Sequence, residues 1–137
     1  MIIVIILSNT IAQTLNPGQS LTFDNTIMHT GCNAECHRNG SAGVTLSKQG
    51  IYEINVKLNV APTAEGSAEM AVMAGGGQLP ETTMISTPAA ANDVNTVFCA
   101  TAFKPCGCCG EMLTIQNIGT VPVTVSPNST LFIKRIA

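Results

Sequence analysis

The stretch that decides the fold is Tyr52-Glu53-Ile54-Asn55-Val56-Lys57-Leu58-Asn59-Val60, in which apolar and polar residues alternate without a break. Successive side chains of a β-strand point to opposite faces, so this pattern predicts a strand with one buried face and one solvent-facing face. Gly50 precedes the stretch and Pro62 follows it, and both residue types interrupt regular structure. We therefore expect a long strand over residues 52–60.

Similar but shorter segments occur along the whole chain, and they are rich in Val, Ile and Thr, which favour strands. They cover residues 1–7, 11–15, 20–23, 26–30, 43–46, 68–74, 83–87, 95–103, 112–116, 121–125 and 130–136. Turn residues separate them at the spacing of about 8–12 residues that is typical of sandwiches and barrels. No stretch shows helical periodicity. We predict an all-β, two-sheet antiparallel sandwich that forms a single domain over residues 1–137.

Charged residues are unusually few in this chain. They make up 10% of it, against 45% hydrophobic residues, whereas soluble domains average about 25% charged residues. Much of the surface must therefore be uncharged, and we expect copies of the chain or a larger assembly to cover part of it. The net charge of −2 comes from scattered residues and includes no basic stripe, which gives no support to nucleic-acid binding.

The apolar run over residues 1–7 has the length of one strand, far below the ~20 residues of a membrane span. It has no positively charged residue before it, as a signal peptide would. We expect a first strand here and no membrane insertion. A second apolar set, formed by Met70, Val72, Met73 and Met84, is expected to fill the core or an interface between subunits.

Residues for catalysis are scarce. The chain has two histidines, His29 and His37, and no Gly-Xaa-Ser-Xaa-Gly motif around a nucleophile. The run Gly75-Gly76-Gly77 lacks the Lys-Ser/Thr pair and the helix of a phosphate-binding loop, so it predicts a hairpin turn. We expect a protein that is not an enzyme and that carries no cofactor.

Six cysteines form two clusters and a singleton, and three interpretations of them remain open. The clusters are Cys32 with Cys36, and Cys106 with Cys108 and Cys109, while Cys99 lies in the strand predicted over residues 95–103 and is expected in the core. The clustered cysteines are free thiols, or they form disulfides that join Cys32 or Cys36 to the 106–109 segment, or they bind a metal ion.

The candidate metal ligands would be His29, Cys32, Cys36, His37, Cys106, Cys108 and Cys109. Zinc usually takes its four ligands from two Cys-x2–4-Cys pairs. The spacing of Cys32 and Cys36 fits this rule, but the 106–109 cluster does not. The metal interpretation is therefore the weakest of the three, and we assign no metal.

Several blocks resemble a known family. The residues Gly50-Ile51-Tyr52 resemble the Gly-Xaa-Tyr motif that opens a strand in C1q/TNF-like jelly rolls. Blocks over His29–Arg38, Leu79–Ala90 and Pro105–Cys109 are similar to recurring blocks of small C1q/TNF-like proteins encoded by Firmicutes and their phages. The resemblance runs from about Thr26 to Ile133. It implies a jelly roll that trimerises about a threefold axis, serves display or adhesion, and has no catalytic residues.

From this resemblance we expect a structural virion surface protein, made in the cytoplasm of a bacterial host, that forms a trimeric capsid decoration or head-fibre knob. Its partners would be two further copies and other virion proteins of the capsid or fibre base. Many relatives carry a stalk before the jelly roll, whereas here Met1 leads directly into strand-like sequence. We therefore expect a knob that docks through the strands of residues 1–25 or through the trimer base.

Two alternatives to a capsid role stay open. One is the tip of a phage tail fibre that binds a host receptor or glycan through exposed loops such as Glu65–Ser67 or Ala91–Asp93. The other is a trimer of the same fold on the surface of a bacterial spore.

Overall fold

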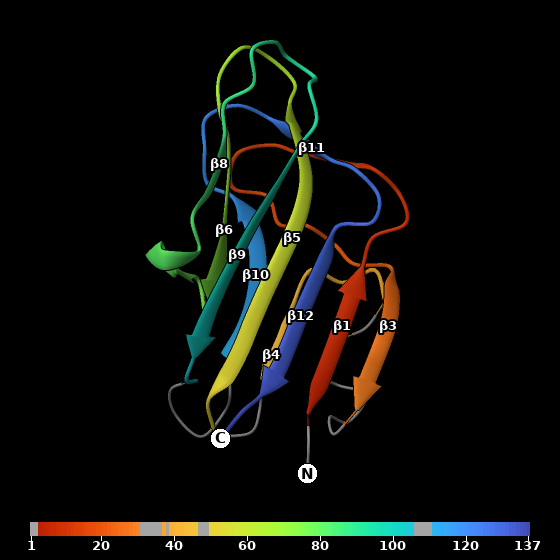
Figure 1. The fold of residues 1–137 in the computed structure, drawn as a ribbon, viewed down its shortest axis with the longest axis vertical. Helices are drawn as coiled ribbons and strands as arrows, with labels where there is room; N and C mark the ends of the chain where they lie inside the picture. Colours follow the sequence, from red (N-terminus) through yellow and green to blue (C-terminus); the bar gives the residue numbers. More distant parts are fainter. Residues whose placement is uncertain (1–2, 31–36, 38, 47–49, 106–110) are drawn as a thin grey trace.

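The chain forms a sandwich of two antiparallel β-sheets, seen in Figure 1. The computed structural model describes residues 3–30, 37, 39–46, 50–105 and 111–137. The elements are β1 (Val4–Ser8), β2 (Gln13–Leu15), β3 (Asn25–Thr30), β4 (Val44–Leu46), β5 (Tyr52–Pro62), β6 (Ala68–Ala74), β7 (Gly77–Gln78), the 3-10 turn η1 (Pro80–Thr82), β8 (Met84–Ser86), β9 (Asn95–Phe103), β10 (Glu111–Asn117), β11 (Val123–Val125) and β12 (Thr130–Arg135). This confirms the predicted fold class.

The larger sheet is built around β5. Val60 of this strand pairs with Val125 of β11 and with Asn95 of β9, so β9 lies along one side of β5 while β11 and β12 share the other side. Beyond β12 come β1 and then β3, and β2 pairs with β11. Both sides of β1 are thus paired within the chain. The smaller sheet has the order β4-β10-β6, with β7 and β8 on the far side of β6.

The core lies between the sheets and follows from the alternation in β5. Its five apolar side chains from Tyr52 to Val60 point inward and are all buried, whereas Glu53, Asn55, Lys57 and Asn59 point outward. Met70 and Val72 of β6 and Met84 of β8 are buried from the other sheet, as predicted, while Met73 is half-buried. Full burial of each such side chain stabilises the fold by roughly 1.5–3 kcal/mol.

The strand predicted over residues 20–23 is wrong. This segment makes only isolated bridges, Ser20 with Gln116 and Phe23 with Ser41. The reason is that the side chain of Gln13 hydrogen-bonds to the backbone of Thr22. Its Oε1 accepts the Thr22 N–H at 3.0 Å, and its Nε2 donates to the Thr22 carbonyl oxygen at 2.6 Å. These groups are therefore not available to a neighbouring strand. The two apolar side chains of the segment, Leu21 and Phe23, are nevertheless buried.

Smaller differences concern the ends of elements. β5 continues past Val60 to Pro62, which pairs with Val123 at the end of the strand, where a missing N–H is tolerated. Residues 75–76 form the predicted turn and lead into β7. In the described residues, no helix has the length and apolar character needed to cross a membrane.

Candidate interaction surface

The predicted ligand and disulfide residues Cys32, Cys36, Cys106, Cys108 and Cys109 lie outside the described residues, so their bonding state stays a prediction. The two histidines are described. His29 lies in β3, at the edge of the larger sheet, and is exposed. Within the described part of the chain, no group of three or more His, Cys, Asp or Glu side chains is placed to hold a metal ion.

His37 is engaged by the backbone around it. Its Nδ1 lies 2.9 Å from the carbonyl oxygen of Gly43, and its Nε2 lies 3.3 Å from that of Phe23. The ring also meets the Phe23 ring edge-on, with centroids 6.4 Å apart. Whichever nitrogen carries the proton, both are turned toward backbone oxygens. The His37 ring is therefore held between the backbones of Gly43 and Phe23, and neither nitrogen points into open space.

Cys99 is half-buried in β9 and packs against the core together with Val97 and Phe103. Burial raises the pKa of the Cys99 thiol, so it stays protonated at neutral pH. The expectation of a core position is confirmed in part, because the side chain lies at the margin of the core. The thiol is a packing group and is not activated as a nucleophile.

The outer face of the larger sheet is the most distinctive surface of the described molecule. Directly opposite residues on neighbouring strands share a face, and the register therefore aligns the outward side chains of β5 with those of its neighbours. We call this surface the Phe98 face, and it consists of Thr96, Phe98, Ala100 and Ala102 of β9, Glu53, Asn55, Lys57 and Asn59 of β5, Thr130, Phe132 and Lys134 of β12, and Val4 and Ile6 of β1.

Most of the Phe98 face is apolar or uncharged. Its central row runs from Ala100 through Asn55 and Phe132 to Ile6. Phe98 itself is 78% exposed, on the strand at the edge of the sheet. A free phenyl ring there leaves roughly 1.5–3 kcal/mol of hydrophobic free energy unused. Such an exposed apolar surface is typical of a face that another molecule covers.

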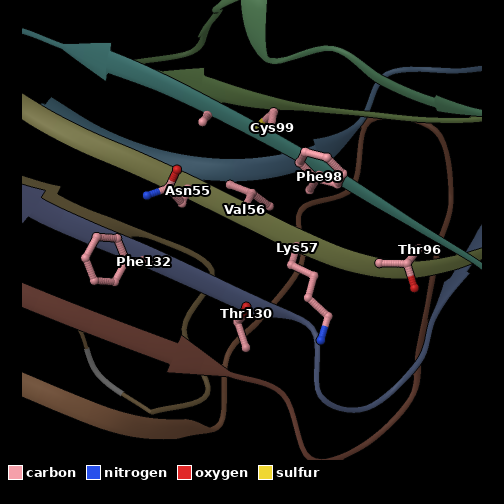
Figure 2. Close-up of a pocket in the computed structure, with 9 residues that line it drawn as sticks. Asn55, Val56, Lys57, Thr96, Phe98, Cys99, Thr130 and Phe132 are labelled. Atoms are coloured by element: carbon pink, nitrogen blue, oxygen red, sulfur yellow. The ribbon is translucent and has the colours of Figure 1, made fainter.

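A groove of about 520 Å³ runs across this face. Its lining comes from β5 (Asn55, Val56 and Lys57), β9 (Thr96, Phe98, Cys99 and Ala100) and β12 (Thr130 and Phe132). Figure 2 shows Phe98 and Phe132 on the two strands that flank β5, with Lys57 between those strands. The groove is therefore an apolar trough that contains one charged side chain.

The charges on this face are arranged unevenly. Lys134 lies directly opposite Glu53, where opposite charges attract each other, and the Glu53 carboxylate also accepts a hydrogen bond from Asn55 Nδ2 at 2.9 Å. Lys57 lies opposite Phe98 on one side and Thr130 on the other. No carboxylate lines the groove in the described structure. Among the described residues, Lys57 therefore has no carboxylate beside it in the groove.

Two loops meet at the end of the sandwich that lies away from the chain termini in Figure 1. The Asn92 N–H donates to the Pro62 carbonyl oxygen at 2.8 Å, and the Ser67 and Thr87 hydroxyls lie 2.8 Å apart. These contacts join the two loops that, in the tail-fibre alternative, are expected to bind a host receptor or glycan. Glu65 and Asp93 are both exposed there. We call this end the loop tip.

Comparison with known proteins supports the fold. No family model matches the sequence, and no curated protein matches it. Solved structures do: the globular domain of the zebrafish complement 1qA protein (TM-score 0.71, 10% identity, 98% of this chain and 96% of that chain), murine APRIL (TM-score 0.73, 15%, 99% and 100%) and the Eiger TNF of S. frugiperda (TM-score 0.72, 13%, 99% and 93%). The chain therefore has the jelly-roll fold of C1q and TNF domains, as the resemblance implied.

The Phe98 face was not predicted from the sequence, although β9 contains a signal for it. One side of this strand presents Asn95, Val97, Cys99, Thr101 and Phe103, and the other presents Thr96, Phe98, Ala100 and Ala102. Neither side carries a charge, and most residues on each side are apolar. A strand without a polar face is expected to be covered on both sides, and here the core covers only one of them.

Proposed function

We propose that this protein is a structural surface module that assembles as a homotrimer through the Phe98 face and displays its loop tip. The exposed Phe98 at the margin of an apolar groove is the observation that carries this proposal. C1q/TNF-like domains are typically homotrimeric. Assembly through this face would also account for the low charge content, since copies of the chain would cover its least polar surface.

We further propose that the trimer is a virion component, either a capsid decoration or a head-fibre knob. This proposal is supported by the sequence blocks that are similar to phage-encoded C1q/TNF-like proteins. Detection of the protein in purified particles by mass spectrometry would support it. Detection in cells of the producing bacterium but never in particles would contradict it.

A receptor- or glycan-binding role is the second candidate, and the loop tip favours it. Two segments distant in sequence are held together there, with exposed polar side chains from both. A scaffold that positions exposed loops in this way is common in binding proteins. A glycan array probed with the labelled trimer tests this role, and a complete lack of binders there and on host cells would count against it.

The trimer is tested by the Phe98→Ser substitution. We expect the wild-type chain to have three times the mass of the monomer at micromolar concentration, as measured by light scattering. The variant loses about 1.5–3 kcal/mol of apolar burial per subunit, which is roughly 10- to 100-fold or more in association constant per interface. It should therefore dissociate to monomers while its far-UV circular dichroism stays unchanged.

Ile85→Ser is the matched control. Ile85 is also an exposed, large apolar residue, 57% accessible, but it lies in β8 of the smaller sheet. This variant should remain a trimer. A wild-type chain that is a monomer at micromolar concentration, or an Ile85→Ser variant that dissociates as readily as Phe98→Ser, would overturn the assignment of the interface.

A further inference from the structure

Lys57 is the charged residue that lines the groove of the Phe98 face. It points outward from the middle of β5, the central strand of the larger sheet. Phe98 and Thr130 lie directly opposite it, and neither can neutralise it. Figure 2 shows its side chain extending toward β12, on the side of Thr130. In a single subunit Lys57 is exposed.

Covering the Phe98 face changes the surroundings of this cation. Removing an unpaired ammonium from water costs several kcal/mol. A threefold assembly would cover one Lys57 from each of three copies, because symmetry gives every subunit the same environment. The cost is thus incurred three times, and the like charges also repel one another.

Glu53, the carboxylate of the Phe98 face, does not offset this cost. Glu53, on the same face of β5, lies opposite Lys134 and accepts a hydrogen bond from Asn55. The other groove residues are apolar, hydroxyl or amide side chains. The Thr96 hydroxyl is already donated to Asn59 Oδ1 at 2.8 Å. The Thr130 hydroxyl, opposite Lys57, remains as a donor that faces the same space.

We propose that Lys57 and Thr130 form an inorganic oxyanion site, of the phosphate or sulfate class, that is completed when the Phe98 face is covered by further copies. This inference rests on the proposed trimer. Ammonium and hydroxyl groups are suitable donors for such an ion, and charge-assisted hydrogen bonds are the stronger ones. Binding of the ion by the assembled state alone makes assembly dependent on its concentration.

The test measures the monomer–trimer equilibrium by sedimentation at constant ionic strength, with inorganic phosphate replacing part of the chloride. If one phosphate is taken up per trimer, the association constant of the wild type should rise about tenfold for each tenfold rise in phosphate above its dissociation constant. Lys57→Met should show no dependence on phosphate. At low phosphate it should assemble at least as tightly as the wild type, because it covers no charge.

Lys104→Met is the matched control, since it removes the same charge from an exposed position outside the Phe98 face. It should keep the phosphate dependence. A phosphate-insensitive wild-type trimer overturns this inference and leaves the proposed trimer intact. So does a Lys57→Met variant that keeps the dependence, which would indicate a general salt effect. If assembly of the wild type does not depend on phosphate and Lys57→Met weakens it, the partner of Lys57 is a carboxylate of the neighbouring copy instead of a phosphate. A chain that is a monomer in every buffer overturns both proposals.

Discussion

At the scale of single residues, Asp24 shows how a side chain can hold two segments together. Its carboxylate accepts a hydrogen bond from the Thr10 N–H at 2.8 Å and a second, shorter one from the Thr10 hydroxyl. The contact joins the segment that follows β1 to the one that precedes β3. Because both bonds favour the ionised form, they hold the pKa of Asp24 below its ordinary value of 3.8, and the bond from the hydroxyl has the larger effect.

This lowered pKa predicts a pH dependence with a definite sign. A carboxyl group with a depressed folded-state pKa stabilises the fold above its ordinary pKa, and this contribution is lost as the pH falls through the lower value. Thr10→Val removes the hydroxyl and keeps the backbone bond, so the pKa of Asp24 should rise part of the way toward 3.8. Titration of the Asp24 carboxyl carbon by NMR measures this change.

Thr14→Val is the control for this experiment, since the Thr14 hydroxyl contacts that of Thr124 and not Asp24. It should leave the titration curve of Asp24 unchanged. A Thr10→Val protein whose Asp24 titrates as in the wild type would show that the hydroxyl does not cause the shift.

At the scale of elements, Asn117 joins three parts of the sandwich. It ends β10 and is completely buried. Its Nδ2 donates to the carbonyl oxygens of Leu15 and Val121, both at 3.0 Å, and its Oδ1 accepts the Gly119 N–H at 3.0 Å. It thereby links the end of β2 and the turn before β11 to the smaller sheet.

Asn117→Ala should be strongly destabilising, because it leaves two carbonyl groups and one N–H without their partner. Each buried polar group left unsatisfied costs roughly 1–3 kcal/mol, so the free energy of unfolding should fall by about 3 kcal/mol or more. Urea denaturation at a fixed chain concentration measures the loss. Gln116→Ala removes one side-chain bond to Gly18 at a half-buried position and should cost only about 1 kcal/mol. Equal losses in the two variants would refute this role.

Some elements of the fold were predictable from the sequence, and others were not. β5 was predictable, because its apolar and polar residues alternate over nine positions. β9 was predictable as a mainly apolar run of nine residues that ends before Pro105. The segment over residues 20–23 has the apolar spacing of a strand, but its backbone partner is the side chain of Gln13, and no local pattern indicates that. The position of Asn117 is equally hidden, since one of its partners lies 102 residues away.

The candidate surface was predictable only in part. Low charge content indicated that some surface is covered, and the two apolar sides of β9 indicate which strand is involved. The groove, however, needs β9, β5 and β12 side by side, and that order results from the jelly-roll topology. The spacing of the clustered cysteines did not decide between free thiols, disulfides and a metal site, and these cysteines lie outside the described residues.

At the scale of the whole molecule, the two candidate surfaces lie on different sides of the sandwich. The Phe98 face occupies the outer side of the larger sheet, and the loop tip occupies the end away from the chain termini (Figure 1). In the proposed trimer, an interface on this side of the sandwich would leave the loops of all three copies free. Binding at such a tip would be multivalent, and several weak contacts would then act together.

Assembly through a stable interface also has a thermodynamic signature. When unfolding and dissociation are coupled in a trimer, mass action stabilises each chain by about 0.9 kcal/mol for every tenfold rise in concentration. For a chain of 137 residues, the typical unfolding entropy of about 2.1 cal/mol/K per residue converts this to a rise in Tm of about 3 °C. Differential scanning calorimetry over a hundredfold range of concentration should therefore give a rise of about 6 °C.

Phe98→Ser provides the decisive comparison for this last prediction. A monomer unfolds at a temperature that does not depend on its concentration, so the variant should give one Tm over the same range and a lower one than the wild type at every concentration. Because Phe98 is exposed and belongs to no part of the core, the substitution leaves the folded subunit intact, and the difference in Tm measures assembly. A wild-type Tm that is independent of concentration while the protein sediments as a trimer would mean that the subunits dissociate before they unfold. The apolar groove would then contribute to assembly but not to the stability of the sandwich itself.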